Sequence, residues 1–441
     1  MLKNKTVDQI ISLMVFLSPL VFRLLLDISY YTQIVRTYGY IGYSMNTTFF
    51  HYIISWLFLI PFLFFHYNFC LRYKFSSIVA IFFLFASVIP NTTLYAFMPV
   101  KGLFIVWLLV YWFLFYFLLY ILPDFFTSKI VRVPNYVSVV LLILISSVII
   151  YVSMRYTSLR LWVNIYDVYS IRWDQESWGL PSLFNYIIMA AGTILPFFLV
   201  FFFSKRNMIL VFSTILVILL NYGIGGHKSV LFSLVIAVFG YFFFSYYRLK
   251  YIGFVFIALP VFSLLEQILL RSTNILALFI HRGFFIPARI TQVSYYFFKS
   301  HELDLYRQKF MRRFGFRSPY DMDIDHIISG IGFNDYGSRA NNGLFSDAYS
   351  NLGILGIFII PIVLVIILKL FDLCSGSINE KLFFGTAVSC FIALFSTSFS
   401  IALLSSGLIL MMLVLYSVNF STFSVYKGRS FLILKSNKNC K

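Results

Sequence analysis

The 441-residue chain is 61% hydrophobic and only 11% charged, whereas a typical soluble domain is roughly half apolar and a quarter charged. This composition excludes an ordinary soluble enzyme and indicates that lipid surrounds most of the chain. The formal net charge of +18 does not indicate nucleic-acid binding, because the basic residues lie in pairs between apolar runs and not on one polar domain.

Apolar runs long enough to cross a bilayer recur along the whole chain. Crossing about 30 Å of hydrocarbon at 1.5 Å per residue takes roughly 20 residues. The runs predict an all-α, polytopic integral membrane protein with about twelve transmembrane helices, the first of them an uncleaved N-terminal helix. The predicted spans lie near residues 8–26, 49–68, 76–97, 102–122, 136–153, 183–203, 208–223, 229–247, 251–270, 352–371, 383–400 and 405–423.

Basic residues are distributed unequally between the two faces that these spans define. The positive-inside rule therefore predicts that the richer face, which includes both termini, is cytoplasmic. That face carries Lys3, Lys5, Arg72, Lys74, Lys129, Arg132, Lys205, Arg206, Arg248, Lys250, Lys369, Lys381 and the tail residues Lys427, Arg429, Lys435, Lys438 and Lys441. The short connections of the other face carry Arg36, Lys101, Arg155, Arg160, Arg172 and Lys228.

Two segments on the outer face are long. The chain therefore divides into spans one to nine over residues 1–270, with an outer loop near 154–182, then a large outer loop over 271–351, and finally three spans with a basic tail over 352–441. In the large loop, HRGFFIPARITQVSYYFFKS predicts one or two amphipathic helices lying against the membrane. A polar, Gly-rich stretch, SGIGFNDYGSRANNGLFSDAYSNLG, follows before the tenth span.

Cations on the outer face are the clearest chemical feature of the sequence. Arginine captures phosphate oxygens in a planar, bidentate way, so an anion near the membrane surface is the expected ligand. The alternative is a loop kept soluble by paired charges. Lys228 lies in the Gly-rich turn NYGIGGHKSVLF at the start of the eighth span, where backbone N–H groups also favour an anion. The loop arginines are Arg271, Arg282, Arg289, Arg312, Arg313, Arg317 and Arg339.

Few acidic residues are candidates for chemistry. Glu266 lies within the ninth span, where a charge costs about 2.5–3.5 kcal/mol, so it is either an ion-pair partner of Arg271 or a catalytic base. Asp321, Asp323 and Asp325 predict a solvated acidic turn and not a metal site, because a calcium loop needs a Gly and a distal Glu at fixed offsets. No zinc, Walker A or GxSxG motif occurs, and four cysteines are expected to be reduced thiols: Cys70, Cys374, Cys390 and Cys440.

The arrangement of these parts resembles the O-antigen polymerase family, the Wzy-type polymerases of oligosaccharide repeat units. The resemblance covers the span count, the large late outer loop, GGHKSVLF between spans seven and eight, HRGFFIPAR after span nine, and ISGIGFNDYGSRANNGLFSDAYSNLGILG entering span ten. In the related O-antigen ligases a His followed by ten residues and a Gly marks this last segment. Here Asn342 precedes Gly353 at that spacing, so the His is absent.

The resemblance implies transfer of a growing glycan from one undecaprenyl diphosphate carrier to a sugar hydroxyl of the next lipid-linked repeat unit. The resemblance further implies that this reaction takes place at the periplasmic face of the bacterial inner membrane, and no cofactor or metal is expected. Preorganised cations stabilise a diphosphate leaving group, and a carboxylate orients the incoming hydroxyl. The expected diphosphate ligands are Lys228, Arg282 and Arg289, with Arg339 near the glycan, Arg313, Tyr336 and Asn342 as further substrate contacts, and Asp347, or else Glu266, as base.

Several interpretations stay open. Tyr336, Tyr349, Trp173 and Trp178 are expected either to stack on sugar rings or to anchor the interface. A lipid-linked oligosaccharide flippase or another transporter has a similar span count, and an O-antigen ligase or a glycosyltransferase using polyprenyl phosphate sugars are further alternatives. Expected partners are the lipid-linked oligosaccharide, membrane lipids and a chain-length regulator protein, with no nucleic acid.

Overall fold

The computed structural model describes residues 2–100, 102–125, 136–161, 171, 174–175, 177–246, 248–340, 343–376 and 378–426. Side chains are described for these residues except 2–8, 10, 228, 245, 246, 313 and 419–426. The protein is 81% helical and has no strand in these ranges. The prediction of an all-α polytopic membrane protein is therefore confirmed.

Ten helical segments of the described chain are long and apolar enough to cross a membrane. Five are single helices: α7 (Gly102–Ile121), α8 (Tyr136–Thr157), α10 (Ser182–Ser204), α11 (Met208–Gly225) and α17 (Ile354–Ser375). The first of the other five consists of α1 (Leu2–Ser29), η1 (Tyr30–Ile34), α2 (Val35–Tyr38) and the short turn η2 (Gly39–Ile41). The remaining four are α3 (Phe49–Leu57) with α4 (Ile60–Cys70), α5 (Phe75–Phe83) with η3 (Leu84–Val88) and α6 (Ile89–Phe97), η4 (Leu249–Tyr251) with α13 (Ile252–Leu270), and α19 (Phe399–Leu403) with α20 (Leu408–Tyr426).

The two remaining predicted spans correspond to α12 (Lys228–Tyr246) and α18 (Glu380–Ser396), which is 17 residues long. These helices pack closely, because a Cβ on Gly385 would lie 2.5 Å from the Cα of Ala237. Glycine therefore permits backbone contact along this seam. All twelve predicted runs are helical, and ten of them satisfy the length and hydropathy expected of a span.

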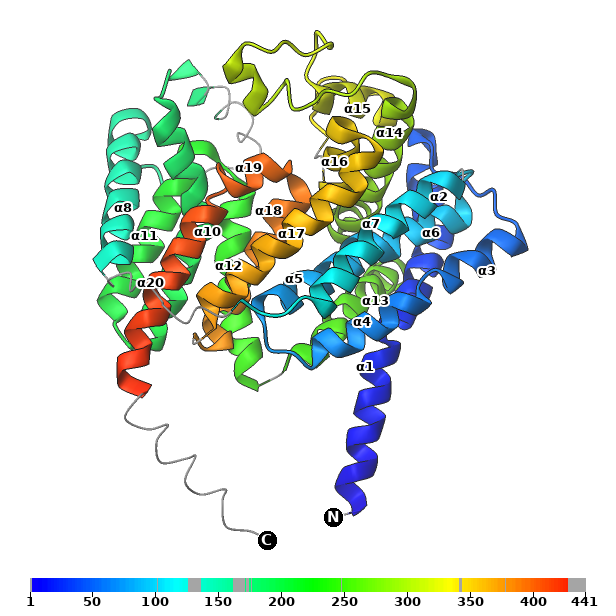
Figure 1. Ribbon diagram of the computed structural model, residues 1–441, viewed down its shortest axis with the longest axis horizontal. Coiled ribbons are helices and arrows are strands. Elements are labelled where there is room, and N and C mark those ends of the chain that lie inside the picture. The colour runs from blue at the N-terminus through cyan, green and yellow to red at the C-terminus, as the bar shows by residue number, and fades with distance from the viewer. Residues whose placement is uncertain are drawn as a thin grey trace.

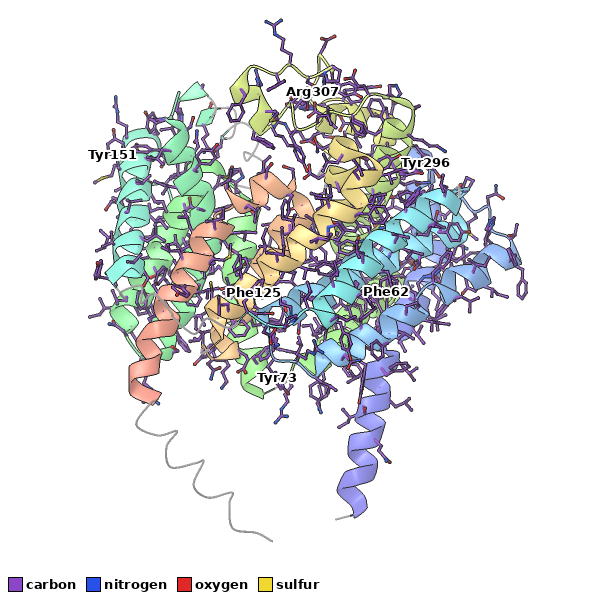
Figure 2. The ribbon with its side chains drawn as sticks, viewed as in Figure 1. Phe62, Tyr73, Phe125, Tyr151, Tyr296 and Arg307 are labelled. Atoms are coloured by element: carbon purple, nitrogen blue, oxygen red, sulfur yellow. The ribbon has the colours of Figure 1, made fainter. Side chains whose placement is uncertain are left out.

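The segment between α13 and α17 lies at one end of the molecule (Figure 1). It consists of η5 (Leu276–Phe285), α14 (Ile286–Ser300), η6 (Phe310–Phe314), α15 (Ile324–Phe333) and α16 (Leu344–Leu352). The start of α1 and the end of α20 lie at the opposite end. The side-chain view agrees, with Tyr151 and Arg307 at the first end and Tyr73 at the second (Figure 2).

One expectation about the large loop differs from the structure. The helix formed by η5 and α14 does not lie on the surface of the bundle but inside it, with Ile280, Phe285 and Ala288 at most 1% exposed. It packs against α6, α13, α15 and α16. Most of its apolar side faces protein, while Leu278 and Phe279 remain 58% and 42% exposed.

A buried charge cluster joins α7, α5 and α17 at the end of the bundle opposite to this loop. Lys369 is only 3% exposed, and its amine donates to the Asp124 carboxylate at 3.0 Å. Lys74 pairs with the same carboxylate. The sequence pattern placed Lys369 in a basic connection, whereas it is a buried residue of α17.

Replacing Asp124 by asparagine is expected to destabilise the fold by about 1 kcal/mol, because it removes the carboxylate that accepts from the buried Lys369 amine and leaves Asp372 as its acidic neighbour. The melting temperature of the detergent-solubilised protein measures this loss. Glu302→Gln is the matched control, since it breaks the Arg307–Glu302 pair, whose carboxylate is 64% exposed. Equal melting temperatures for the two variants would contradict a stabilising role of the buried cluster.

Candidate functional site

The candidate site is built on the continuous helix η5–α14. Residues 276–285 have π-helical hydrogen bonding, and Pro287 occupies the first turn of α14. Proline lacks an amide hydrogen and cannot continue the regular bonding pattern of the preceding turn, and π-helical segments are frequent at functional sites. His281, Arg282 and Arg289 all belong to this helix.

Arg289 is a half-buried cation that has no acidic partner in the part of the chain that the structure describes. One terminal nitrogen donates to Gln292 Oε1 at 2.8 Å, while Nε is buried and has no hydrogen-bond partner among the described residues. Burial lowers the pKa of the guanidinium, and the neighbouring titratable groups are the neutral phenols of Tyr43, Tyr30 and Tyr296 and not carboxylates. A buried donor left unsatisfied is costly, so this position is suited to an anionic ligand.

The connection between α2 and α3 completes the surroundings of Arg289. A terminal guanidinium nitrogen would lie 3.2 Å from a Cβ built on Gly42, whose φ of +95° also requires glycine. The Tyr43 hydroxyl is buried and has no hydrogen-bond partner among the described residues, whereas Tyr30 donates to Ser44 O at 2.9 Å. Sequence reasoning missed this contribution, and the only signal for it was the Tyr/Gly-rich stretch YGYIGY.

His281 is a third polar group of this site that has an unsatisfied hydrogen-bonding atom among the described residues. Its ring is 5% exposed, stacks on Tyr38 at 3.6 Å and meets the edge of Tyr43 at 5.5 Å. Its Nε2 atom is buried without a partner among the described residues. Burial, and to a smaller degree Arg282, lowers the pKa of His281 to about 4, so the imidazole is neutral at pH 7.

This shift predicts how stability depends on pH. Between pH 6.5 and pH 4 the unfolded chain binds a proton at His281 and the folded chain does not, so stability is complete above about pH 6.5 and falls as the solution is acidified. The expected loss at pH 5 is about 2 kcal/mol. His281→Phe keeps an aromatic ring beside Tyr38, and its melting temperature should fall less between pH 7 and pH 5 than that of wild type. Parallel pH profiles would refute the prediction.

Arg282 adjoins this group of polar atoms. Its side chain is exposed and has no ion pair among the described residues. Both predicted anion ligands thus belong to one helix, where Arg289 is half-buried and Arg282 is exposed.

Asp347, the expected base, is 0% exposed in α16. The Lys309 amine and Asn351 Nδ2 donate to its Oδ1, the latter at 3.0 Å, and the backbone amide of Phe399 donates to Oδ2 at 2.9 Å. Both carboxylate oxygens are therefore occupied by donors. This geometry makes Asp347 an anchor that joins the outer loop, α16 and the start of α19.

Further hydrogen bonds join residues 304–306 to α16. The Asp304 amide donates to Ser350 O at 3.0 Å and the Tyr306 amide to Asn351 Oδ1 at 2.7 Å. Leu305 and Tyr306 both have positive φ, 52° and 59°, a conformation that persists in such residues only when the surroundings determine it. Burial, and then the charge of Asp347, raises the pKa of Tyr306 above its usual range.

Glu266 is held by a local turn and not by Arg271. Its carboxylate accepts three hydrogen bonds from the bend after α13. Ser272 Oγ donates at 2.8 Å, and the amides of Asn274 and Ile275 donate at 3.1 and 2.7 Å. These are the free amides that begin the next helix, which a carboxylate caps favourably. The predicted ion pair with Arg271 is therefore absent among the described contacts, and the carboxylate instead caps the following helix.

Arg339 and Tyr336 lie together at the surface of the loop. Arg339 is 3.8 Å from the Asp323 carboxylate and donates to His326 Nε2 at 3.3 Å. The ring of Tyr336, 55% exposed, covers Gly330 so closely that no Cβ would fit there. Arg339 is therefore a paired, exposed cation, unlike Arg289.

Asp325 differs from the other residues of the predicted acidic turn. Asp321 and Asp323 are exposed, but Asp325 is half-buried at the start of α15. Burial raises the pKa of Asp325 although Lys309 and Arg339 lower it. A carboxyl with a raised pKa beside cations is a candidate for proton transfer, and the sequence pattern did not distinguish it.

The remaining expected residues are not part of this group. Tyr349 is buried against Tyr295, with ring centres 4.7 Å apart, and Trp178 stacks on Tyr156 at 4.9 Å, so both make protein contacts. Residues Asn342 and Trp173 and the side chains of Lys228 and Arg313 lie outside the described part of the chain.

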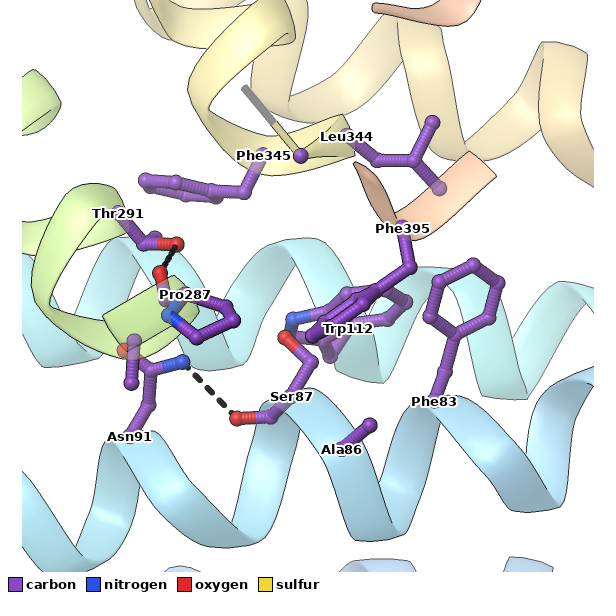
Figure 3. A pocket seen from close by; sticks show the side chains of 12 residues that line it. Phe83, Ala86, Ser87, Asn91, Trp112, Pro287, Thr291, Leu344, Phe345 and Phe395 are labelled. Carbon is purple, nitrogen blue, oxygen red and sulfur yellow. Dashed lines mark hydrogen bonds between the residues drawn. The ribbon is translucent and has the colours of Figure 1, made fainter. Parts of the chain in front are cut away.

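Two cavities lie near η5–α14. A void of about 20 Å³ between α6, α7 and α14 has room for about one water molecule. Asn91 and Thr291 border it (Figure 3); the Asn91 amide donates to Ser87 O at 2.9 Å, and the Thr291 hydroxyl donates to Pro287 O at 2.8 Å. A cavity of about 620 Å³ lies between α10, α11, α12, α18 and η5 and reaches Gly283, next to Arg282. Of these two, the second has the size of a ligand pocket, as does a hollow of about 520 Å³ bordered by Pro99 and by Tyr296, Lys299 and Ser300 at the C-terminal end of α14.

The first span contains a buried ion pair that sequence reasoning missed. Arg23 is 0% exposed; its Nε lies 3.1 Å from Asp27 Oδ1 and donates to Thr93 Oγ1 at 2.8 Å, and a terminal nitrogen donates to Ser55 Oγ at 3.0 Å. The first predicted span ends near residue 26, but α1 continues through Asp27 to Ser29. The pair neutralises itself one helical turn apart, which permits its burial within the membrane-spanning segment.

Comparisons of the chain with protein-family models, with curated proteins and with solved structures found no match. Its function is therefore inferred from its own residues and geometry.

Proposed function

We propose that this protein is a membrane glycosyltransferase of the O-antigen polymerase type, which joins oligosaccharide repeat units carried on undecaprenyl diphosphate. The observation that carries the proposal is Arg289, a half-buried guanidinium with no described acidic partner. Tyr43, whose buried hydroxyl also has no described partner, interacts electrostatically with Arg289 and in turn meets the ring of His281 at 5.5 Å. An anionic headgroup that enters from the membrane would satisfy all three.

In the proposed reaction the acceptor hydroxyl forms a bond to C1 of the donor sugar while the bond from C1 to the diphosphate oxygen breaks. The electron pair of that bond leaves with the diphosphate, whose developing charge Arg289 and Arg282 stabilise. The hydroxyl proton passes to a carboxylate. Asp325 suits this role better than Asp347, because Asp347 already accepts bonds at both oxygens while burial raises the pKa of Asp325.

The proposed location is the bacterial inner membrane, with the segment 271–353 on the periplasmic side. The distribution of basic residues supports this orientation, and the start of α1 and the end of α20 share the face opposite to that segment (Figure 1). The family resemblance leads us to propose a chain-length regulator protein as a partner. The proposed chemistry requires no metal or cofactor.

Deletion of the gene tests the proposal in cells. The expected result is surface glycan limited to single repeat units on the lipid core, because units are still flipped and ligated but are not joined. Silver-stained gels of extracted glycolipid distinguish the outcomes. Complete loss of surface glycan would contradict the proposal and indicate a flippase or a ligase.

A flippase for lipid-linked oligosaccharides is the second candidate, and one observation favours it. Intramembrane ion pairs are frequent in transport and proton-relay proteins, and the Arg23–Asp27 pair is such a feature. Arg23→Met with Asp27→Leu decides between the candidates. The polymerase proposal expects the double variant to retain polymer formation in vitro, whereas a flippase that depends on the pair would lose transport in proteoliposomes.

A further inference from the structure

The cavity of about 620 Å³ between α10, α11, α12 and α18 has a lining that the diphosphate site does not explain. Its polar groups are mostly hydroxyls, contributed by Ser and Thr side chains of α10, α12 and α18 and by Ser406. The described lining contains no carboxylate, lysine or arginine, and His227 is its one titratable group. A cavity of this kind suits an uncharged ligand with both apolar and hydroxyl surfaces.

Two buried groups of the lining lack hydrogen bonds that a ligand could supply. Asn221 is 2% exposed; its amide nitrogen donates to Ile188 O at 3.3 Å, but its Oδ1 has no partner among the described residues. Ser389 is 7% exposed, and its hydroxyl also has none. Buried polar groups are nearly always hydrogen-bonded in native proteins. A hydrocarbon tail would leave both unsatisfied, whereas a hydroxylated ligand would satisfy them.

The position of the cavity connects it to the proposed diphosphate site. Gly283 and Leu278 of η5 form part of its wall, and Gly283 is the residue next to Arg282. The cavity is lined by the C-terminal end of α11 and the N-terminal half of α12, which places it toward the same end of the bundle as the 271–353 segment. A headgroup held at Arg282 and Arg289 would therefore have its attached sugars beside the opening.

We propose that this cavity is a glycan subsite that takes the neutral, hydroxyl-rich oligosaccharide of the lipid-linked substrate, and not its prenyl tail. The assignment rests on the proposed function for the nature of the substrate. It adds which part of the substrate is bound here: the hydroxyl and amide groups of the described lining are suited to sugar hydroxyls.

The test measures two probes on the purified full-length protein in nanodiscs. One probe is the free oligosaccharide released by mild acid from the lipid-linked precursor of the source cells, and the other is undecaprenyl diphosphate without sugar. Asn221→Leu with Ser389→Val is expected to weaken oligosaccharide binding at least tenfold and to leave undecaprenyl diphosphate binding within twofold. Ser213→Val is the matched control, because this α11 hydroxyl is exposed on the outside of the bundle and bonds only to Ile209 O.

The outcomes are distinguishable. Unchanged oligosaccharide binding in the double variant would overturn the subsite, and so would a selective loss of undecaprenyl diphosphate binding, which would assign the cavity to the tail. Failure of the wild-type protein to bind undecaprenyl diphosphate at all would instead remove the proposed function. A melting temperature equal to that of Ser213→Val shows that the double variant is folded.

Discussion

Replacing Arg289 by alanine will weaken the binding of undecaprenyl diphosphate by about 100-fold or more and abolish polymer formation. Each charge-assisted hydrogen bond to a phosphate contributes about 1.5–3 kcal/mol, and Arg289 has a buried Nε free to make one in addition to those of its terminal nitrogens. Arg289→Lys retains the charge but loses the planar fork, so it should keep a small part of the activity. The melting temperature should change little or rise, because the substitution removes an unsatisfied buried cation.

Arg317→Ala is the matched control for Arg289. Arg317 belongs to the same outer segment, but its side chain is exposed and has no ion pair among the described residues. Its replacement should alter binding by less than threefold. Wild-type polymer from Arg289→Ala, or equal losses from both variants, would show that general positive charge and not this buried group holds the substrate.

Replacing Asp347 by alanine is expected to destabilise the protein by about 2–4 kcal/mol, since it leaves the Lys309 amine and the Phe399 amide without their shared acceptor. Polymer formation should fall with stability and not independently of it. The double variant Asp347→Ala with Lys309→Met should regain part of the lost melting temperature, because the half-buried amine is then also removed.

The same experiment separates an anchor from a catalytic base. A base would give an Asp347→Asn variant with wild-type melting temperature and no activity at any pH. An anchor gives parallel losses that low temperature partly reverses. Asp325→Asn, in contrast, should lose activity while it keeps the wild-type melting temperature, because its carboxylate accepts no described hydrogen bond.

The membrane spans were predictable from the sequence because length and apolarity are local properties. The exceptions have local causes too. The predicted end of the first span, before Asp27, is too early. A carboxylate normally marks the end of an apolar run, but Arg23 one helical turn earlier neutralises Asp27. The helix η5–α14 was assigned to the membrane surface because an apolar side and a basic side also describe an interfacial helix.

The candidate site was predictable only in part. Arg282 and Arg289 were recognisable as cations of an outer segment, but the difference between a half-buried, unpaired Arg289 and an exposed, paired Arg339 depends on tertiary contacts. Asp347 looked like a free carboxylate because Lys309 and Phe399 lie 38 and 52 residues away in the chain. Tyr43 approaches His281 from a different outer loop, and no local pattern indicates that contact.

Incubation of the purified protein with lipid-diphosphate repeat units, followed by gel separation of the products, tests the central claim most directly. The account predicts a ladder whose steps each add one repeat unit, together with release of one undecaprenyl diphosphate per step, and no ladder from Arg289→Ala. Recovery of only the starting repeat unit with wild-type protein that is folded and binds the substrate would contradict it.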